Sequence, residues 1–399
     1  ENNIDDMIIK FKSIYDKMIK EKAHELEITP GGDETFFTNQ MLIVLMELKS
    51  GFIFVEKPEE SRDHKTWENN SAPWLSEFKL VRCFVSDKAK ALLKLAKTTL
   101  GVSRIPDLFH MMNDVSKVMK FSFSRLKKRT EKSIEDTCKL ISKGVNVAQN
   151  KMAAARLKLE LRAILIDQGT YQRNQRALST SLHPFSILTA QKQNSKDVET
   201  SMLSYLRKIK LLKEKHEISD SGKKLARVER QIPDSAKLVD QWWGWTESSL
   251  DSSDITPELK DWLLNNLLPY IYWSRQIKKT SSKKIRRCYE ISARVARQKL
   301  EMHLLTKRLI SNEVKKSDWI KWAENMSDMF IRTTSPIEGR NGWLSQIHFN
   351  GRGLSEKRVQ SQAGIHNYYL KRSNDTTACE RLSGIKPEDM FGFIMQHIN

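Results

Sequence analysis

An apolar hairpin near the N-terminus constrains the fold of this chain more than any other feature. Met41–Leu48 and Phe52–Val55 are apolar runs rich in β-formers, and the turn signal Lys49-Ser50-Gly51 separates them. A further strand is expected around Asp33, just before the hairpin. These segments predict three consecutive antiparallel strands and exclude an all-helical chain.

The next segments alternate between helix and strand. Residues 63–78 and 89–100 have helical spacing, and residues 80–85 form a short apolar run typical of a buried strand. The predicted order is therefore β-β-β-α-β-α. In such a topology the first and fourth strands are neighbours.

The chain of 399 residues is long enough for two or three domains. Residues 1–23 are predicted to form a helix, and 24–118 and 326–399 the two parts of one α/β domain. Residues 119–325 have a basic, helical texture with few strand signals, and predict a large all-α insertion. The predicted fold class is thus a mixed sheet with flanking helices, interrupted by that insertion.

Charge indicates the kind of partner. Lys and Arg number 68 against 49 Asp and Glu, a formal charge of +19, and nucleic acid is the commonest polyanion that such an excess serves. Residues 275–310 hold twelve Lys or Arg and two Glu. From this stretch we expect contacts to the DNA backbone by Lys278, Lys279, Lys283, Lys284, Arg286 and Arg287.

Several classes of protein are excluded or disfavoured by the sequence. No window approaches 18 uninterrupted apolar residues, so we expect no membrane-spanning helix. The N-terminus is acidic and lacks the apolar segment of a secretory signal, and the four cysteines lie far apart without a C-x-x-C pair. We therefore expect an intracellular protein of the cytoplasm or nucleoid, without a zinc knuckle or disulfide framework.

Three acids stand where chemistry is expected. Asp33 lies on the first strand, Asp87 at the end of the fourth, and Glu338 in the first turn of a helix that begins near Pro336. Clustered carboxylates repel one another and are hard to keep ionised without a cation. Oxygen ligands suit Mg²⁺ or Mn²⁺, and two such ions support in-line phosphoryl displacement.

These acids and their surroundings resemble the DDE transposases. Residues 86–92 resemble the stretch around the second aspartate of that family, and Pro106-Asp107-Leu108-Phe109-His110 matches its Asp/Cys-x-x-His signature. Residues 333–342 resemble the segment around its final glutamate. The wide interval between Asp87 and Glu338 is similar to the hAT-like layout, in which an all-α domain interrupts the fold.

The resemblance implies an RNase H-like fold and a transposase. Asp33, Asp87 and Glu338 would hold two Mg²⁺ (or Mn²⁺) ions, hydrolyse a phosphodiester at the transposon end and join the freed end to target DNA. DNA and a homodimer or higher oligomer are the implied partners. A nuclease or resolvase that only hydrolyses, and a non-catalytic DNA-binding protein derived from a transposase, are the alternatives.

Each site residue also has a structural alternative. Asp87 could cap the helix that follows it, and Glu338 could bond back to Ser335 in a capping box. Asp107 and His110 are expected to support the site rather than to coordinate metal. Asn341 follows Glu338 on one helix face and could orient it, whereas Arg340 could contact a phosphate or simply be a solvated surface charge.

Overall fold

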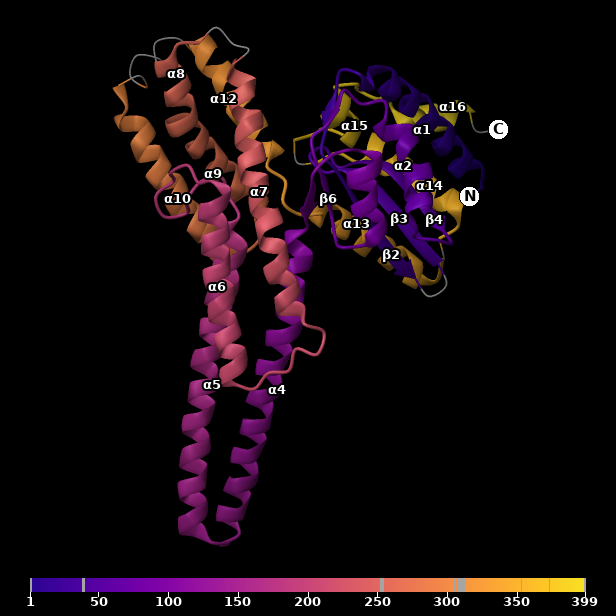
Figure 1. Ribbon diagram of the computed structural model, residues 1–399. Coiled ribbons are helices and arrows are strands. Elements are labelled where there is room, and N and C mark those ends of the chain that lie inside the picture. Colours follow the sequence, from indigo (N-terminus) through magenta and orange to yellow (C-terminus); the bar gives the residue numbers. More distant parts are fainter. Residues whose placement is uncertain are drawn as a thin grey trace. The chain divides into compact units, whose positions relative to one another are not determined.

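The computed structural model (Figure 1) describes residues 2–37, 40–251, 255–304, 306, 313–352, 354–372 and 374–397. The chain divides into two compact units, one formed by Glu1–Phe109 with Asp328–Asn399 and the other by His110–Ser327. Helix α4 (Leu108–Ser142) runs unbroken through residue 118, where the sequence predicted a domain boundary. The N-terminal part of the first unit therefore ends at Phe109 instead of at 118.

A five-stranded mixed sheet forms the centre of the first unit. Its order is β4-β3-β2-β6-β7, with β2–β3–β4 antiparallel and with β6 and β7 parallel to β2. The strands are β2 (Pro30–Phe37), β3 (Gln40–Glu47), β4 (Phe52–Glu59), β6 (Phe84–Ser86) and β7 (Arg104–Pro106). The predicted three-strand meander and the predicted pairing of the first strand with the strand that precedes Asp87 are both confirmed.

Two details of the sheet differ from the prediction. The run at 80–85 is not one strand, because Leu80–Val81 (β5) pairs with Glu27–Ile28 (β1) in a separate two-stranded sheet before β6 begins. Strand β7 was not predicted, since its three residues are too few to show a period of two. The chain is a mixed α/β protein with much helix.

Helices surround this sheet. They are α1 (Asn2–Ala23), α2 (His64–Leu75), α3 (Lys90–Lys94), η1 (Leu95–Thr99), α13 (Ser335–Ile347), η3 (His348–Arg352), α14 (Glu356–Tyr368), α15 (Ala378–Ser383) and α16 (Met390–His397). Apolar residues of α1 at three- and four-residue spacing, Ile8, Phe11, Tyr15 and Ile19, are buried. Helix α14 covers the edge of the sheet, because the Asn367 side chain bonds both the N–H and the C=O of Ile53 on β4.

The second unit is entirely helical apart from an isolated bridge between Phe185 and Lys192, among the residues described. Its helices are α4, α5 (Val147–Ser181), α6 (Ser195–Lys215), α7 (Lys224–Asp251), α8 (Pro257–Trp262), η2 (Leu263–Leu267), α9 (Leu268–Lys279), α10 (Lys283–Met302) and α12 (Glu313–Met329), which runs two residues past the boundary. Its core is aromatic: Trp242, Tyr272 and Trp273 are fully buried. His183 lies among them, with Nδ1 2.5 Å from the Tyr272 hydroxyl.

Two adjacent glycines let neighbouring side chains pack closely on β2. A Cβ at Gly31 would lie 2.8 Å from the Leu48 side chain, and one at Gly32 would lie 3.0 Å from Phe84 and 3.3 Å from Trp67 of α2. Gly32 thus faces α2, and by strand alternation Asp33 faces the opposite side of the sheet. This packing explains why a Pro-Gly-Gly run occupies a central strand.

Replacement of Gly32 by valine should destabilise the first unit by about 1–3 kcal/mol, because the added methyls overpack the contact with Phe84 and Trp67. Urea denaturation followed by circular dichroism measures this change. Gly339→Ala is the matched control: nothing lies within 4 Å of its Cβ position in α13, so it should stabilise by about 0.5–1 kcal/mol. Equal stability of Gly32→Val and the parent protein would contradict the packing argument.

Candidate metal centre

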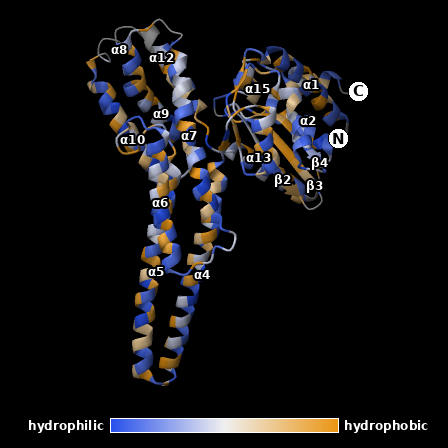
Figure 2. Ribbon diagram, in the orientation of Figure 1, coloured by the Kyte–Doolittle hydropathy of each residue, from blue (hydrophilic) through white to orange (hydrophobic). Residues whose placement is uncertain are grey.

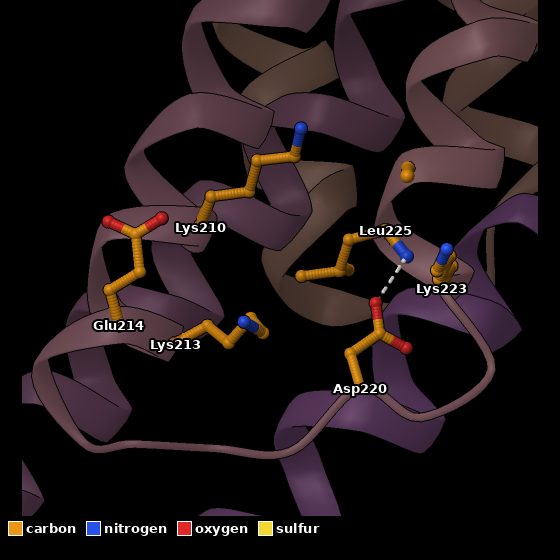
Figure 3. Close-up of a pocket in the computed structure, with 7 residues that line it drawn as sticks. Lys210, Lys213, Glu214, Asp220, Lys223 and Leu225 are labelled. Atoms are coloured by element: carbon orange, nitrogen blue, oxygen red, sulfur yellow. Dashed lines mark hydrogen bonds between the residues drawn. The ribbon is translucent and has the colours of Figure 1, made fainter.

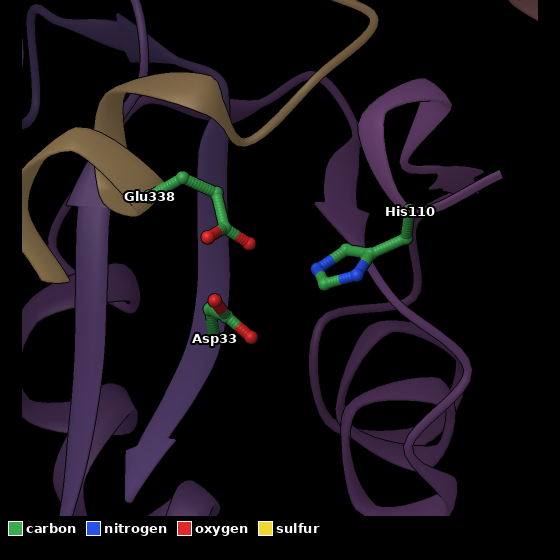
Figure 4. A group of neighbouring side chains, drawn as sticks. All are labelled: Asp33, His110 and Glu338. Carbon is green, nitrogen blue, oxygen red and sulfur yellow. The ribbon is translucent and has the colours of Figure 1, made fainter. Parts of the chain in front are cut away.

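Two acids from distant parts of the sequence bring potential metal ligands together in the first unit. A carboxylate oxygen of Asp33 and one of Glu338 lie within 4.8 Å of each other (Figure 4). Asp33 is on β2 and Glu338 is in the first turn of α13, whereas His110, the third residue of α4, belongs to the second unit. Asp33 and Glu338 both belong to the first unit, although 305 positions separate them, and they form the centre of the site.

The start of α13 presents Glu338 to the sheet. Thr334 is the N-cap, Pro336 lies in the first turn, and no side-chain hydrogen bond caps the helix in the described part of the chain. The capping box between Ser335 and Glu338 is therefore not formed, and that alternative is wrong. Figure 4 shows the Glu338 and Asp33 carboxylates directed toward each other.

Asn341 joins α13 to the strand that carries Asp33. It is only 6% exposed, and its Nδ2 donates a hydrogen bond to Asp33 Oδ2 at 3.2 Å. The sequence suggested that Asn341 could orient Glu338, whereas the bond goes to Asp33. Asn341 Oδ1 is buried and has no hydrogen-bond partner among the residues described. A buried acceptor left without a donor is costly, so this oxygen is suited to a ligand.

Asp107 ties the start of α4 to the segment that enters α13. It is 1% exposed, and its carboxylate accepts hydrogen bonds from the Phe109 N–H at 2.8 Å and from the Thr334 hydroxyl. The Leu108 N–H donates to the Arg332 carbonyl at 3.0 Å. Asp107 therefore positions Thr334, the N-cap of α13, which lies four residues before Glu338.

Asp87 directly follows the expected strand, which ends at Ser86, but its carboxylate is not grouped with those of Asp33 and Glu338. β2 and β6 pair Gly32 with Ser86, so Asp33 and Asp87 follow at the next positions of neighbouring parallel chains. The Asp87 carboxylate accepts the Ala89 N–H at 2.8 Å. Helix α3 starts later than predicted and has Ala89, not Asp87, as its N-cap, so the helix-cap alternative is wrong.

Glu34 was missed by the sequence analysis. It lies on the face of β2 opposite Asp33, where its carboxylate accepts a hydrogen bond from Trp67 Nε1 at 3.2 Å and lies 3.5 Å from Arg62. Burial raises the pKa of the Glu34 carboxyl, and the charge of Asp87 adds to that increase. The sequence feature that could have drawn attention to Glu34 is its position directly after Asp33.

Arg340 does not lie on the surface. It is 5% exposed and forms a bidentate ion pair with Glu56 of β4, which is 2% exposed, at 2.8 Å and 2.5 Å. The expectations that Arg340 contacts a phosphate or is a solvated charge are both corrected. One row of paired residues crosses the three antiparallel strands, from Asp33 on β2 through Val44 on β3 to Glu56 on β4. Helix α13 bonds both ends of this row, through Asn341 to Asp33 and through Arg340 to Glu56.

The Arg340–Glu56 pair should be the most sensitive point of the first unit. Removing one partner, by Arg340→Met or Glu56→Gln, leaves a buried charge without its counterion, and should cost about 3–5 kcal/mol. Replacing both residues by methionine should recover much of that loss, because two apolar side chains of similar volume leave no charge behind. A double-mutant cycle from urea denaturation measures this; additive losses would contradict the assignment.

His366 should make stability fall in acid. Its imidazole donates to the Gly51 carbonyl oxygen at 2.9 Å, and burial, followed by the charge of Arg340, lowers its pKa from 6.5 to about 4. The unfolded chain therefore binds the proton first, and stability present above pH 6.5 is lost as the pH falls toward 4, by about 3 kcal/mol in total.

Denaturation at several pH values between 7.5 and 4, in the parent and in His366→Gln, measures the contribution of His366. Glutamine keeps a donor for Gly51 but does not titrate, so the variant should lose less stability over this window. Parallel curves for the two proteins would contradict the prediction.

The predicted basic residues are exposed. Lys278 and Lys279 end α9, and Lys283, Lys284, Arg286 and Arg287 begin α10, all in the second unit. Arg286 also donates to the Thr280 carbonyl oxygen at 2.9 Å. Residues 305 and 307–310 of the same basic stretch lie outside the described residues.

A pocket of about 270 Å³ lies at the end of α6 and the start of α7 (Figure 3). Its lining includes Lys210, Lys213, Asp220 and Lys223. Asp220 accepts the N–H groups of Lys224 and Leu225, and Lys210 pairs with Glu229 at 2.6 Å. Asp220 thus serves a helix start and Lys210 a surface ion pair, so neither lining residue is available as a reactive group in this pocket.

The donor set of the first unit fits a divalent cation. Two carboxylates and the buried Asn341 Oδ1 are oxygen ligands that Mg²⁺ and Mn²⁺ accept, and repulsion between Asp33 and Glu338 is relieved by a cation. The group provides ligands for one ion. The second ion expected from the sequence would need Asp87.

Comparison with known proteins adds little about activity. The model of a family of unknown function, DUF6399, matches residues 263–399, which include Glu338 and Asn341 but not Asp33. No curated protein matches the sequence. In the described part of the chain, no helix is both long and apolar enough to cross a membrane. The matched segment is 137 of 399 residues, so the chain shares its C-terminal third with that family.

Proposed function

We propose that the chain is a DDE transposase-like enzyme that cleaves and joins DNA strands with the help of divalent metal ions. The observation that carries this proposal is the convergence of Asp33 and Glu338, two acids 305 positions apart, to within 4.8 Å in one compact unit. Unrelated acidic side chains have no reason to meet in a partly buried position, because their charges repel.

The topology of the sheet supports an RNase H-like catalytic unit. Three antiparallel strands are followed by two parallel ones, the first acid lies on the central strand, and the last acid lies on a helix reached only after a helical insertion. This arrangement is the one that the resemblance to DDE transposases implies. The fold class and the position of the acids are thus in agreement.

The residues have distinct tasks in the proposed reaction. Asp33 and Glu338 would hold the cation, and Asn341 fixes the Asp33 carboxylate. A bound cation would lower the pKa of water and neutralise charge on the departing oxygen. Asp87 would complete the triad, and with it a second cation site, if its carboxylate turned away from the Ala89 N–H.

DNA is the proposed partner of the basic residues on α9 and α10. Their charges neutralise phosphates and release condensed counterions, so DNA affinity should fall steeply as the salt concentration rises. We also propose that the enzyme acts as a homodimer or higher oligomer on paired DNA ends, as transposases do.

One observation favours a second candidate, a non-catalytic DNA-binding protein derived from a transposase. The Asp87 carboxylate is bonded to the Ala89 N–H and is not grouped with the Asp33 and Glu338 carboxylates. If that bond persists in the presence of metal, the triad stays incomplete. A hydrolytic nuclease with the same acids remains the other alternative, and it would nick DNA without joining it.

Asp33→Asn and Glu338→Gln should each abolish Mn²⁺ binding, because each removes one of two charged ligands. Isothermal titration with Mn²⁺ measures binding, and incubation with supercoiled plasmid measures nicking and joining. Glu60→Gln, an exposed carboxylate after β4, is the matched control and should change neither. Asp87→Asn should retain Mn²⁺ binding at one site but lose DNA cleavage.

The outcomes separate the candidates. Nicked but never joined products indicate the nuclease. Mn²⁺ binding that depends on Asp33 without cleavage of any DNA indicates the non-catalytic protein. Binding and cleavage that survive both Asp33→Asn and Glu338→Gln would overturn the proposed function.

A further inference from the structure

Helix α5 has apolar side chains on two opposite faces between residues 152 and 171. Ala154, Ile164 and Tyr171 are buried within the second unit. Met152, Leu159 and Ile166, by contrast, are 62%, 67% and 59% exposed. At 3.6 residues per turn the two rows lie about half a turn apart around the helix. An ordinary surface helix has one apolar stripe, so the second stripe is unexplained by the packing of this unit.

The exposed stripe lies where neighbouring helix α6 has ended. Lys215, the last residue of α6, and His216 contact Asp167 of α5 at 2.6 Å and 2.8 Å. Residues 147–166 of α5 therefore extend beyond α6, as Figure 1 shows for the lower part of the α4–α5 pair. Figure 2 shows hydrophobic and hydrophilic residues intermixed along this part of α5.

The spacing of the stripe is that of a helix-pairing seam. Met152, Leu159 and Ile166 recur every seven residues, and exposed Ala155 and Ala163 lie between them, which permits close approach of another helix. Such a seam is narrow, whereas a helix that lies in a membrane surface needs a broad apolar face. DNA phosphates are charged and would form no favourable contact with the apolar side chains of Met152, Leu159 and Ile166.

The charges beside the stripe select the partner. Lys151, Lys158 and Arg162 flank one edge, and Arg156 with Glu160 flanks the other; all five are exposed. In the described part of the chain the four cations have no ion-pair partner. Pairing α5 with α5 of a second copy would bring these cations against one another, whereas acidic flanks would complement them.

We propose that the Met152–Leu159–Ile166 stripe is a docking site for an acidic amphipathic helix of a partner protein. The partner helix would place apolar residues at heptad positions against the stripe and Glu or Asp against Arg156, Lys158 and Arg162. This proposal concerns the second unit only and does not depend on the proposed enzymatic function.

The test uses the full chain and a synthetic helical peptide of about four heptads, with Leu at the a and d positions and Glu at e and g. Repulsion between its glutamates keeps this peptide from pairing with itself. Fluorescence anisotropy should show binding that weakens as salt increases. The same peptide with Lys at e and g should not bind.

Leu159→Asp should weaken peptide binding at least about tenfold, because it removes a buried apolar contact and places an acid against the glutamates. Arg162→Glu should weaken it as well. Leu211→Asp is the matched control: Leu211 is 58% exposed on α6, outside the stripe, and its replacement should leave binding unchanged. Circular dichroism checks that each variant retains its helix content.

Three results would overturn the proposal. The first is absence of peptide binding, or binding that Leu159→Asp does not change. The second is a dimer in sedimentation velocity that Leu159→Asp dissociates, which would assign the stripe to a second copy. The third is binding to vesicles of phosphatidylcholine and phosphatidylserine that depends on Leu159, which would assign it to a membrane surface.

Discussion

The buried ion pair between Arg340 and Glu56 is the interaction on which the candidate site depends. It joins residues 284 positions apart and holds α13 against β4 with two parallel hydrogen bonds. Glu338 and Asn341 lie on either side of Arg340 in the same helix. The Arg340–Glu56 ion pair therefore also fixes the position at which Glu338 and Asn341 approach Asp33. Two charges this deeply buried stabilise little by themselves, but their geometry specifies one position of the helix.

The site is assembled from parts that the chain keeps far apart. The strand with Asp33, the loop with Asp107 and the helix with Glu338 meet through short polar contacts: Asp107 with Thr334, and Asn341 with Asp33. The helical insertion between the two halves of the first unit leaves these contacts intact. Compact units tolerate long insertions because the entropy of closing a loop grows slowly with its length.

The helical unit combines features of a folded core and of a binding surface. His183 lies among buried Trp and Tyr rings that α7, α9 and α10 contribute and that pack against one another. The outer part of α5, in contrast, retains apolar residues that this core does not cover. Exposed basic residues on α9 and α10 are a third feature of this unit. The core, the apolar residues of α5 and these basic residues all belong to the second unit alone.

The sequence alone determined the strand meander, its pairing with the strand before Asp87 and the helical character of the middle, because apolar periodicity and turn residues are local signals. It also singled out Asp33 and Glu338. Only the tertiary structure decided that Arg340 is buried against Glu56, that Asn341 bonds Asp33, and that Asp87 is bonded to a backbone amide. A charged residue at a helix surface and one in a buried ion pair look alike in sequence, since the partner lies hundreds of residues away and its distance is set by packing.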